Sequence, residues 1–293
     1  MAVGDLITAT RYNNLQNRIA LIMSTGSGNS GYGQTLASSQ LSTGTLVTAT
    51  RVNNLRTDML KARQHQTGLD ESASYPVYTT DNKILEADML NFETLMTPIE
   101  TNKLVIGAGQ STVVTGTSST RTTAWNTRLT HAVTLDFGSA SAARYFFNSG
   151  GQLRMRATLT AGTVNSINTD WVNMLTNMGT ISMNHSATST TGTGTVQPIG
   201  FYGLTSTPVT IFTKSGSGTY TSNSYYVTAA VDVASNTTGT ARYVYLTMRF
   251  NDDKTGSIDE SVTGTLTSYL DYLYATGTNV AVTPPTVTTT TNI

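Results

Sequence analysis

Hydrophobic positions in the first hundred residues recur with the 3.6-residue period of an amphipathic helix. One such pattern follows Thr8 and a second follows Thr48. A threonine hydroxyl at this place accepts a hydrogen bond from a free N–H group of the first turn, so both threonines are predicted N-caps. Gly26 and Gly68 are the predicted helix ends. The hydrophobic positions are Ala9, Tyr12, Leu15, Ile19 and Ile22 in the first pattern and Leu55, Met59 and Ala62 in the second.

The segment that opens the first helix occurs again forty residues later. Nine of the twelve positions in residues 4–15 are identical to their counterparts in residues 44–55. A fainter third copy follows, in which Leu85 corresponds to Ile7 of the first copy. Units this short cannot bury their own hydrophobic face, so each is expected to pack on a sister unit, on the main body or on another chain.

From about residue 103 the hydrophobic period changes from helical to two. Alternating patterns run through residues 129–137, 153–160, 227–233 and 243–250. Such alternation is typical of antiparallel strands with one buried and one exposed face. Segments rich in glycine, serine and asparagine separate the patterns, so we expect an antiparallel β-sandwich.

Two short helices are expected within the sandwich, over residues 139–148 and 168–178. The second has apolar side chains at helical spacing and is followed by Gly179. The predicted fold class is therefore mainly β with helices (α+β). It consists of repeated short N-terminal helices followed by an antiparallel β-sandwich decorated with two short helices.

Three regions are expected along the chain. Residues 1–102 form a helical docking region, residues 103–275 the β-sandwich, and residues 276–293 an extended C-terminal arm rich in threonine and proline. The arm has too little apolar surface to offset the entropy lost on ordering it alone, so we expect it to run along a neighbouring protein. Removing residues 1–70 is expected to leave a soluble β domain that no longer enters its assembly.

Composition agrees with a β-rich, soluble protein. Threonine accounts for 58 of the 293 residues, and its branched side chain favours extended backbone. The 17 basic and 17 acidic residues balance, so we expect no binding to nucleic acid or to a membrane surface. Cysteine is absent, which removes disulfides and thiolate metal sites. No apolar run reaches the length of a membrane helix.

No motif supports a catalytic or cofactor site. Residues 26–31 match G-x-G-x-x-G, but they follow a predicted helix, whereas a phosphate-binding loop follows a strand. Residues 251–262 begin like a calcium loop, but Val262 stands where a bidentate glutamate is needed. Asp259 and Glu260 are adjacent and would point to opposite faces of a strand, which argues against a paired-acid glycosidase. We therefore expect no enzyme activity, no metal and no cofactor.

Several short motifs occur in a characteristic order. They are the G-D-x-I-T-A-x-x-x-N element of residues 4–13, the sequence FFNSGGQL of residues 146–153, the sequence NTDW of residues 168–171, Leu175, and the sequence GTI of residues 179–181. In order and spacing they resemble virion structural proteins of tailed bacteriophages, particularly cyanophages, and the resemblance covers most of the chain. It implies a non-enzymatic component of the tail, neck, baseplate or fibre, present in the virion after assembly in the host cytoplasm.

We expect the chain to act through contacts with other virion proteins and with copies of itself, as a homo-oligomer. Tyrosines are expected among the contacts because tyrosine is enriched in interface cores. A receptor- or glycan-binding tail module, which would contact the host surface, is the first alternative, and a capsid decoration protein is the second. The residues expected at assembly interfaces are Leu6, Ile7, Tyr12, Leu15, Leu46, Val47, Leu55, Tyr225, Tyr243, Tyr245, Val287 and Ile293.

Overall fold

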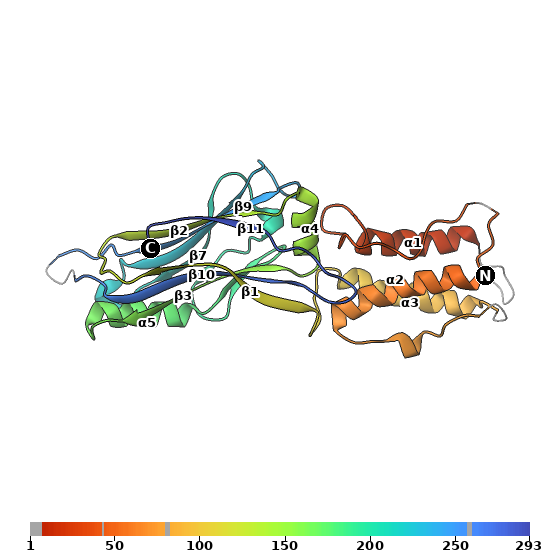
Figure 1. Ribbon diagram of the computed structural model, residues 1–293, viewed down its shortest axis with the longest axis horizontal. Helices are drawn as coiled ribbons and strands as arrows, with labels where there is room; N and C mark the ends of the chain where they lie inside the picture. Colours follow the sequence, from red (N-terminus) through yellow and green to blue (C-terminus); the bar gives the residue numbers. More distant parts are fainter. Residues whose placement is uncertain (1–7, 43, 80–82, 257–259) are drawn as a thin grey trace. The chain divides into compact units, whose positions relative to one another are not determined.

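The computed structural model describes residues 8–42, 44–79, 83–256 and 260–293, and the chain divides into two compact units (Figure 1). The helical unit comprises Met1–Thr112, Arg144–Gly150 and Tyr274–Val282. The β unit comprises Val113–Ala143, Gly151–Leu273 and Thr283–Ile293. Each unit is thus made from three segments of the chain. The helical unit continues well beyond residue 102, so removing residues 1–70 would take away only part of it.

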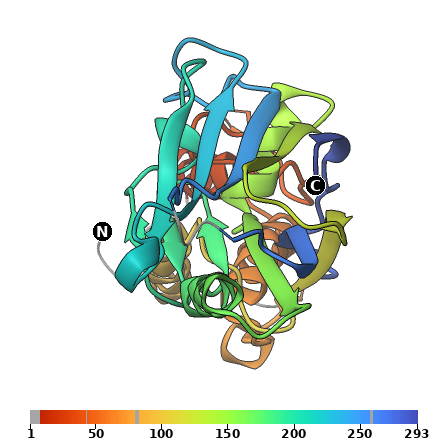
Figure 2. The same cartoon turned by 90° about the vertical axis from the view of Figure 1, so that its left-hand side faces the viewer.

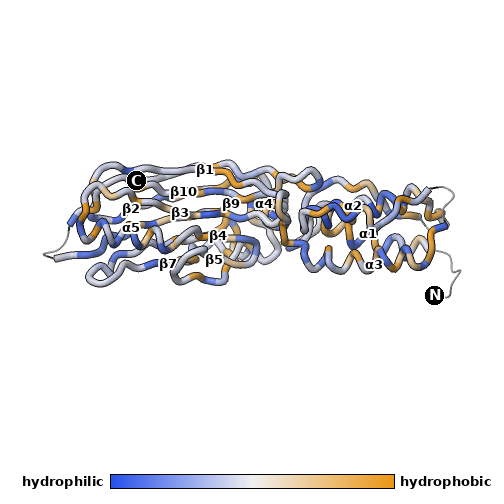
Figure 3. Tube along the Cα trace, turned by 90° about the horizontal axis from the view of Figure 1, so that it is seen from below, coloured by the Kyte–Doolittle hydropathy of each residue, from blue (hydrophilic) through white to orange (hydrophobic). Residues whose placement is uncertain are grey.

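Three helices form the core of the helical unit: α1 (Ala9–Met23), α2 (Ala49–Thr67) and α3 (Glu86–Thr101). The three helices run in the same direction (Figure 1). Two contacts show this: Arg11 in the first turn of α1 bonds Glu86 at the start of α3, and Gln66 near the end of α2 bonds the carbonyl of Ile99 near the end of α3. Hydrophobic and hydrophilic residues alternate along each helix (Figure 3). The buried residues of the three helices form one apolar cluster that includes Tyr12, Leu15, Ile19, Val52, Leu55, Met59, Met89, Phe92 and Met96.

The predicted N-caps of the first two helices are confirmed. The Oγ1 atoms of Thr8 and Thr48 each accept a hydrogen bond from the N–H group three residues later, at 3.2 and 3.4 Å. The end of α2 at Gly68 is also confirmed, since the φ of this residue is 77°, a conformation that suits glycine. The end of α1 differs, because Ser24 caps the helix two residues before Gly26.

The start of α3 corrects the alignment of the fainter repeat by one residue. Leu85 is the N-cap of α3, so it is equivalent to Thr8 and Thr48, and not to Ile7. Leucine has no side-chain acceptor, and here the Oδ2 atom of Asp88 accepts the N–H of Leu85 at 2.7 Å. Positions in α1 therefore correspond to positions 40 residues later in α2 and 77 residues later in α3.

Two antiparallel sheets form the β unit, and they confirm the predicted α+β class with a β-sandwich. The sheets lie in separate layers (Figure 2), with the strand orders β1-β10-β3-β4-β5 and β11-β2-β9-β8-β7-β6. The strands are β1 (Ser111–Arg121), β2 (Arg128–Asp136), β3 (Gln152–Ala161), β4 (Ile181–Met183), β5 (Thr188–Thr190), β6 (Thr195–Val196), β7 (Val209–Ser215), β8 (Ser224–Val231), β9 (Tyr243–Asn251), β10 (Gly264–Ala275) and β11 (Thr286–Thr291). The two predicted short helices are α4 (Ala140–Asn148) and α5 (Ser166–Met178).

The core of the β unit lies between the two sheets. His131 of β2 is buried there, with its Nδ1 atom 3.0 Å from the Oγ of Ser268 of β10, so a hydrogen bond joins the two layers. Burial disfavours the charged imidazole and lowers the pKa of His131 to about 4. Trp171 of α5 completes the core, with its ring centroid 4.9 Å from that of Trp125 and 6.3 Å from that of Phe250.

The C-terminal segment differs from the expected arm. Residues of β11 pair antiparallel with β2, so that Val287 lies opposite Leu135 and Thr291 lies opposite His131. The threonine hydroxyls also bond the edge of the other sheet, since Oγ1 of Thr289 lies 3.2 Å from Oγ1 of Thr117. The segment is extended, as expected, but it lies on its own sheet as an edge strand and needs no neighbouring protein to order it.

Candidate interaction surfaces

The connection between α1 and α2 runs back along the groove that these helices form. Asn13 of α1 holds the peptide group of Leu41 at both ends, because its Nδ2 donates to the carbonyl and its Oδ1 accepts the N–H, both at 2.8 Å. From α2, the two carboxylate oxygens of the buried Asp58 accept the N–H groups of Ala37 and Ser38 at 2.9 and 2.8 Å. Side chains of both helices thus bind the backbone of one extended segment, residues 34–41.

The connection between α2 and α3 covers the next groove in the same way. Asn53, the repeat equivalent of Asn13, donates to the carbonyl of Tyr78 at 2.8 Å and accepts its N–H at 2.9 Å. Arg56 donates to the carbonyl of Tyr75 at 2.6 Å. The rings of Tyr75 and Tyr78 then pack on Phe92 of α3, at centroid distances of 6.2 and 6.4 Å. The repeated asparagine therefore serves to bind the returning chain, a role that sequence reasoning missed.

The third groove, between α3 and α1, is built differently. Leu90 stands where Asn13 and Asn53 stand in the other two helices, and it is 55% exposed. Glu93 stands where Arg56 stands, and Arg11 of α1 reaches it with two hydrogen bonds of 2.6 and 3.0 Å. Among the described residues, no hydrogen bond places an extended segment of the chain over this groove.

Ion pairs link the two helices across the third groove. Besides its bonds to Glu93, Arg11 bonds Glu86 at 2.5 Å, and Arg18 bonds Glu100 at 2.7 Å. The hydrogen bond from Arg11 lowers the pKa of Glu93, and the hydrogen bond from Arg18 lowers the pKa of Glu100. These carboxylates are therefore charged at neutral pH, and their charges are compensated within the groove.

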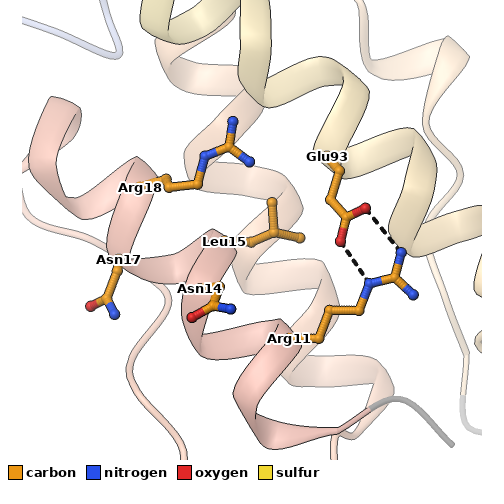
Figure 4. A pocket seen from close by; sticks show the side chains of 6 residues that line it. All are labelled: Arg11, Asn14, Leu15, Asn17, Arg18 and Glu93. Atoms are coloured by element: carbon orange, nitrogen blue, oxygen red, sulfur yellow. Dashed lines mark hydrogen bonds and ion pairs between the residues drawn. The ribbon is translucent and has the colours of Figure 1, made fainter.

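A hollow of about 550 Å³ lies in the third groove, and Figure 4 shows its side chains projecting from α1 and α3. Leu15 forms its buried floor, and the exposed amides of Asn14 and Asn17 stand on the α1 side. A second hollow of about 360 Å³ shares Asn17 and continues along α1 past Leu21, which is 53% exposed. Together they make a furrow along α1. Its lining, in the wider part, is Arg11, Asn14, Leu15, Asn17, Arg18 and Glu93.

The expected interface residues of the repeats separate into two groups. Tyr12, Leu15 and Leu55 are buried in the bundle core, so they pack on sister helices and are not available to another chain. Leu46 is 80% exposed, and Val47 is partly buried against the same core. Leu6 and Ile7 lie outside the described residues.

The expected interface residues of the β unit also separate. Tyr225 is fully buried, with its ring centroid 4.9 Å from that of Phe250, so its assignment to an interface is corrected. Tyr243 and Tyr245 lie on the outer face of the six-stranded sheet, since the residues that alternate with them on β9 are buried. Val287 lies opposite the buried Leu135 and is half-buried. Ile293 is half-buried and donates its N–H to the hydroxyl of Thr291.

The outer face of the six-stranded sheet carries a cluster of aromatic and charged side chains. The rings of Tyr243 and Tyr245 are nearly parallel, at 8°, with centroids 6.4 Å apart, and Tyr245 is 39% exposed. The guanidinium of Arg242 lies 4.8 Å from the centroid of Tyr243 and binds both carboxylate oxygens of Asp136, at 2.7 and 2.6 Å. The hydrogen bond from Arg242 lowers the pKa of Asp136 to about 2.

Within the described ranges, no group of three or more histidine, cysteine, aspartate or glutamate side chains is arranged to hold a metal ion. No helix among the described residues is long and apolar enough to cross a bilayer. Comparisons with protein-family models, curated proteins and solved structures give no match.

Proposed function

We propose that the chain is a non-enzymatic structural component of a tailed-phage virion that acts through protein–protein contacts. The observation that carries the proposal is the third groove of the helical unit. Two equivalent grooves are covered by connecting segments of the chain, and the third presents a hollow with the buried Leu15 at its floor and the exposed amide of Asn14 at its edge. Groups that bind backbone in an extended segment are suited to a polypeptide partner. The motif resemblance supplies the virion context.

Quantitative mass spectrometry of purified particles tests the proposal. The chain should be present in a constant number of copies per particle, and Asn14→Arg, which places a long charged side chain at the third groove, should lower its incorporation at least about tenfold. Asn54→Arg is the matched control, because Asn54 occupies the same position of the second repeat. Particles that contain no copy of the chain would refute the proposal.

A second candidate function, recognition of a host glycan, is favoured by the outer face of the six-stranded sheet. Parallel tyrosine rings offer flat surfaces for sugar rings, and the Arg242–Asp136 pair offers polar groups for hydroxyls. Titration with purified host envelope polysaccharide should then show saturable binding that Tyr245→Ala reduces at least about fivefold. Thr247→Ala, next on the same face of β9, is the control. Equal binding by all three proteins would exclude this candidate.

A further inference from the structure

The carboxylate of Asp170, on α5 of the β unit, is buried, but only one of its oxygens is hydrogen-bonded. Asp170 is 6% exposed. Its Oδ1 accepts the N–H of Ser217 at 2.8 Å and the hydroxyl of the same residue at 2.6 Å. Its Oδ2 is also buried, and no described residue donates a hydrogen bond to it. The buried Asp58 of the helical unit differs, because each of its two oxygens accepts an N–H group.

The negative charge of Asp170 has no cationic partner either. None of the ion pairs between described residues includes this carboxylate. The lysine of β7, a strand that contacts α5, is Lys214, and its Nζ donates to the hydroxyl of Thr193 at 2.8 Å. A buried carboxylate is costly unless it is paired or coordinates a metal ion. The fold therefore leaves one charged oxygen that a bound cation would satisfy.

The loop that connects β7 to β8 brings a second oxygen to the same place. A Cβ atom added to Gly216 would clash with Oδ2 of Asp170 and with the carbonyl oxygen of Tyr220. Both oxygens thus face the small space beside this glycine, which no side chain of its own fills. Carboxylate and backbone carbonyl oxygens are ligands of calcium.

Further acidic residues lie close to this loop. Asn223 is fully buried, its carbonyl accepts the N–H of Gly216 at 2.9 Å, and its Oδ1 accepts the N–H of Lys254 at 2.8 Å. The segment that contains Asp252 and Asp253 therefore lies beside the loop. Its carboxylates add to the negative potential and favour the approach of a cation.

We propose that a calcium ion binds at the loop between β7 and β8, where Oδ2 of Asp170 and the carbonyl oxygen of Tyr220 coordinate it. Residues 217–219 of the loop are exposed, so the ion can enter from solvent and water molecules can complete its coordination. With two protein ligands the affinity is low, with a Kd of about 0.1–1 mM. The site differs from the sequence-based expectation of no metal, because its second ligand is a backbone oxygen. It is independent of the virion context of the proposed function.

Titration of the purified full chain with terbium and calcium tests the proposal. Terbium replaces calcium at oxygen sites and emits when a nearby tryptophan is excited, and Trp171 is the residue next to Asp170. The test variant is Asp170→Asn, which removes the charge and keeps the size. The matched control is Asp58→Asn, at a buried carboxylate whose oxygens both have partners. Circular dichroism first shows that each variant is folded.

Terbium emission of the parent should rise to saturation, and calcium should displace the terbium. Asp170→Asn should bind at least about tenfold more weakly, and Asp58→Asn should bind like the parent. In the parent, saturating calcium should slow hydrogen exchange of residues 216–220 and leave that of residues 37 and 38 unchanged. This measurement decides the matter if Asp170→Asn does not fold.

Three results would overturn the proposal: no saturable binding by the parent, equal binding by folded Asp170→Asn, or unchanged exchange of residues 216–220 at saturating calcium.

Discussion

The helical unit and the β unit are each stabilised internally, and by different kinds of interaction. In the helical unit, single side chains such as Asp58 and Asn13 bind the backbone of connecting segments, and four of the six ion pairs among the described residues lie here. In the β unit, backbone pairing along long strands and an apolar layer between the sheets carry the fold. The difference teaches that the helical unit relies on particular polar residues, whereas the β unit tolerates change on its outer faces.

The largest expected effect of a substitution is in the core of the β unit. Trp171→Ala removes a fully buried ring that packs on Trp125 and Phe250. It should lower the free energy of unfolding by about 3–5 kcal/mol. Urea unfolding followed by the fluorescence of Trp125 measures the change. Tyr245→Ala on the outer face is the control and should cost less than about 1 kcal/mol; a cost equal to that of Trp171→Ala would contradict the comparison.

Acid should weaken both units, because each buries one histidine with a lowered pKa. Burial lowers the pKa of His65 in the helical unit and of His131 in the β unit to about 4, from 6.5. The unfolded chain binds more protons between these values, so stability is fully present above pH 6.5 and falls as the pH drops toward 4. The loss is about 3 kcal/mol for each histidine.

Unfolding titrations at pH 7, 5.5 and 4 check this prediction. His131→Gln should reduce the pH dependence of the β unit, and His65→Gln that of the helical unit. Hydrogen exchange of β2 and of α2 reports the two units separately. An unchanged slope in both variants would show that other groups govern the acid response.

A smaller effect is expected at the buried carboxylate of the helical unit. Asp58→Ala leaves the N–H groups of Ala37 and Ser38 without their acceptor and should cost about 1–3 kcal/mol. Asp58→Asn keeps the size and one acceptor oxygen, so it should cost less. Hydrogen exchange at residues 37 and 38 should be slowest in the parent, faster in the asparagine variant and fastest in the alanine variant. Equal rates would contradict the role of Asp58 as the acceptor for these two N–H groups.

The smallest effects should come from the repeated asparagines. Asn13→Ala and Asn53→Ala each remove a pair of partly buried hydrogen bonds, to Leu41 and to Tyr78, and should each cost about 1 kcal/mol. Asn14→Ala is the neighbouring control and should be neutral in the free chain. Thermal unfolding checks the set, and a cost at position 14 equal to that at position 13 would count against the assigned roles.

Local features of the fold could be read from the sequence, because local physics decides them. The caps at Thr8 and Thr48 and the period-two strands follow from neighbouring residues alone. The buried position of Tyr225 could also have been predicted, since Tyr225 and Val227 lie two residues apart on β8 and so face the same side of the sheet. The hydrogen bonds of Asn13 and Asn53 to the connecting segments could not be predicted, because their partners Leu41 and Tyr78 lie 28 and 25 residues further along the chain. The strand of residues 286–291 lacks hydrophobic alternation and forms only because β2 pairs with it.

A density map of the assembled particle tests the central claim most directly. The account predicts polypeptide over all three grooves of the bundle: residues 34–41 over the first groove, residues 72–78 over the second, and a segment of another chain over Leu15, between α1 and α3. A map in which the first two grooves are covered and the third faces solvent at full occupancy of the chain would contradict it.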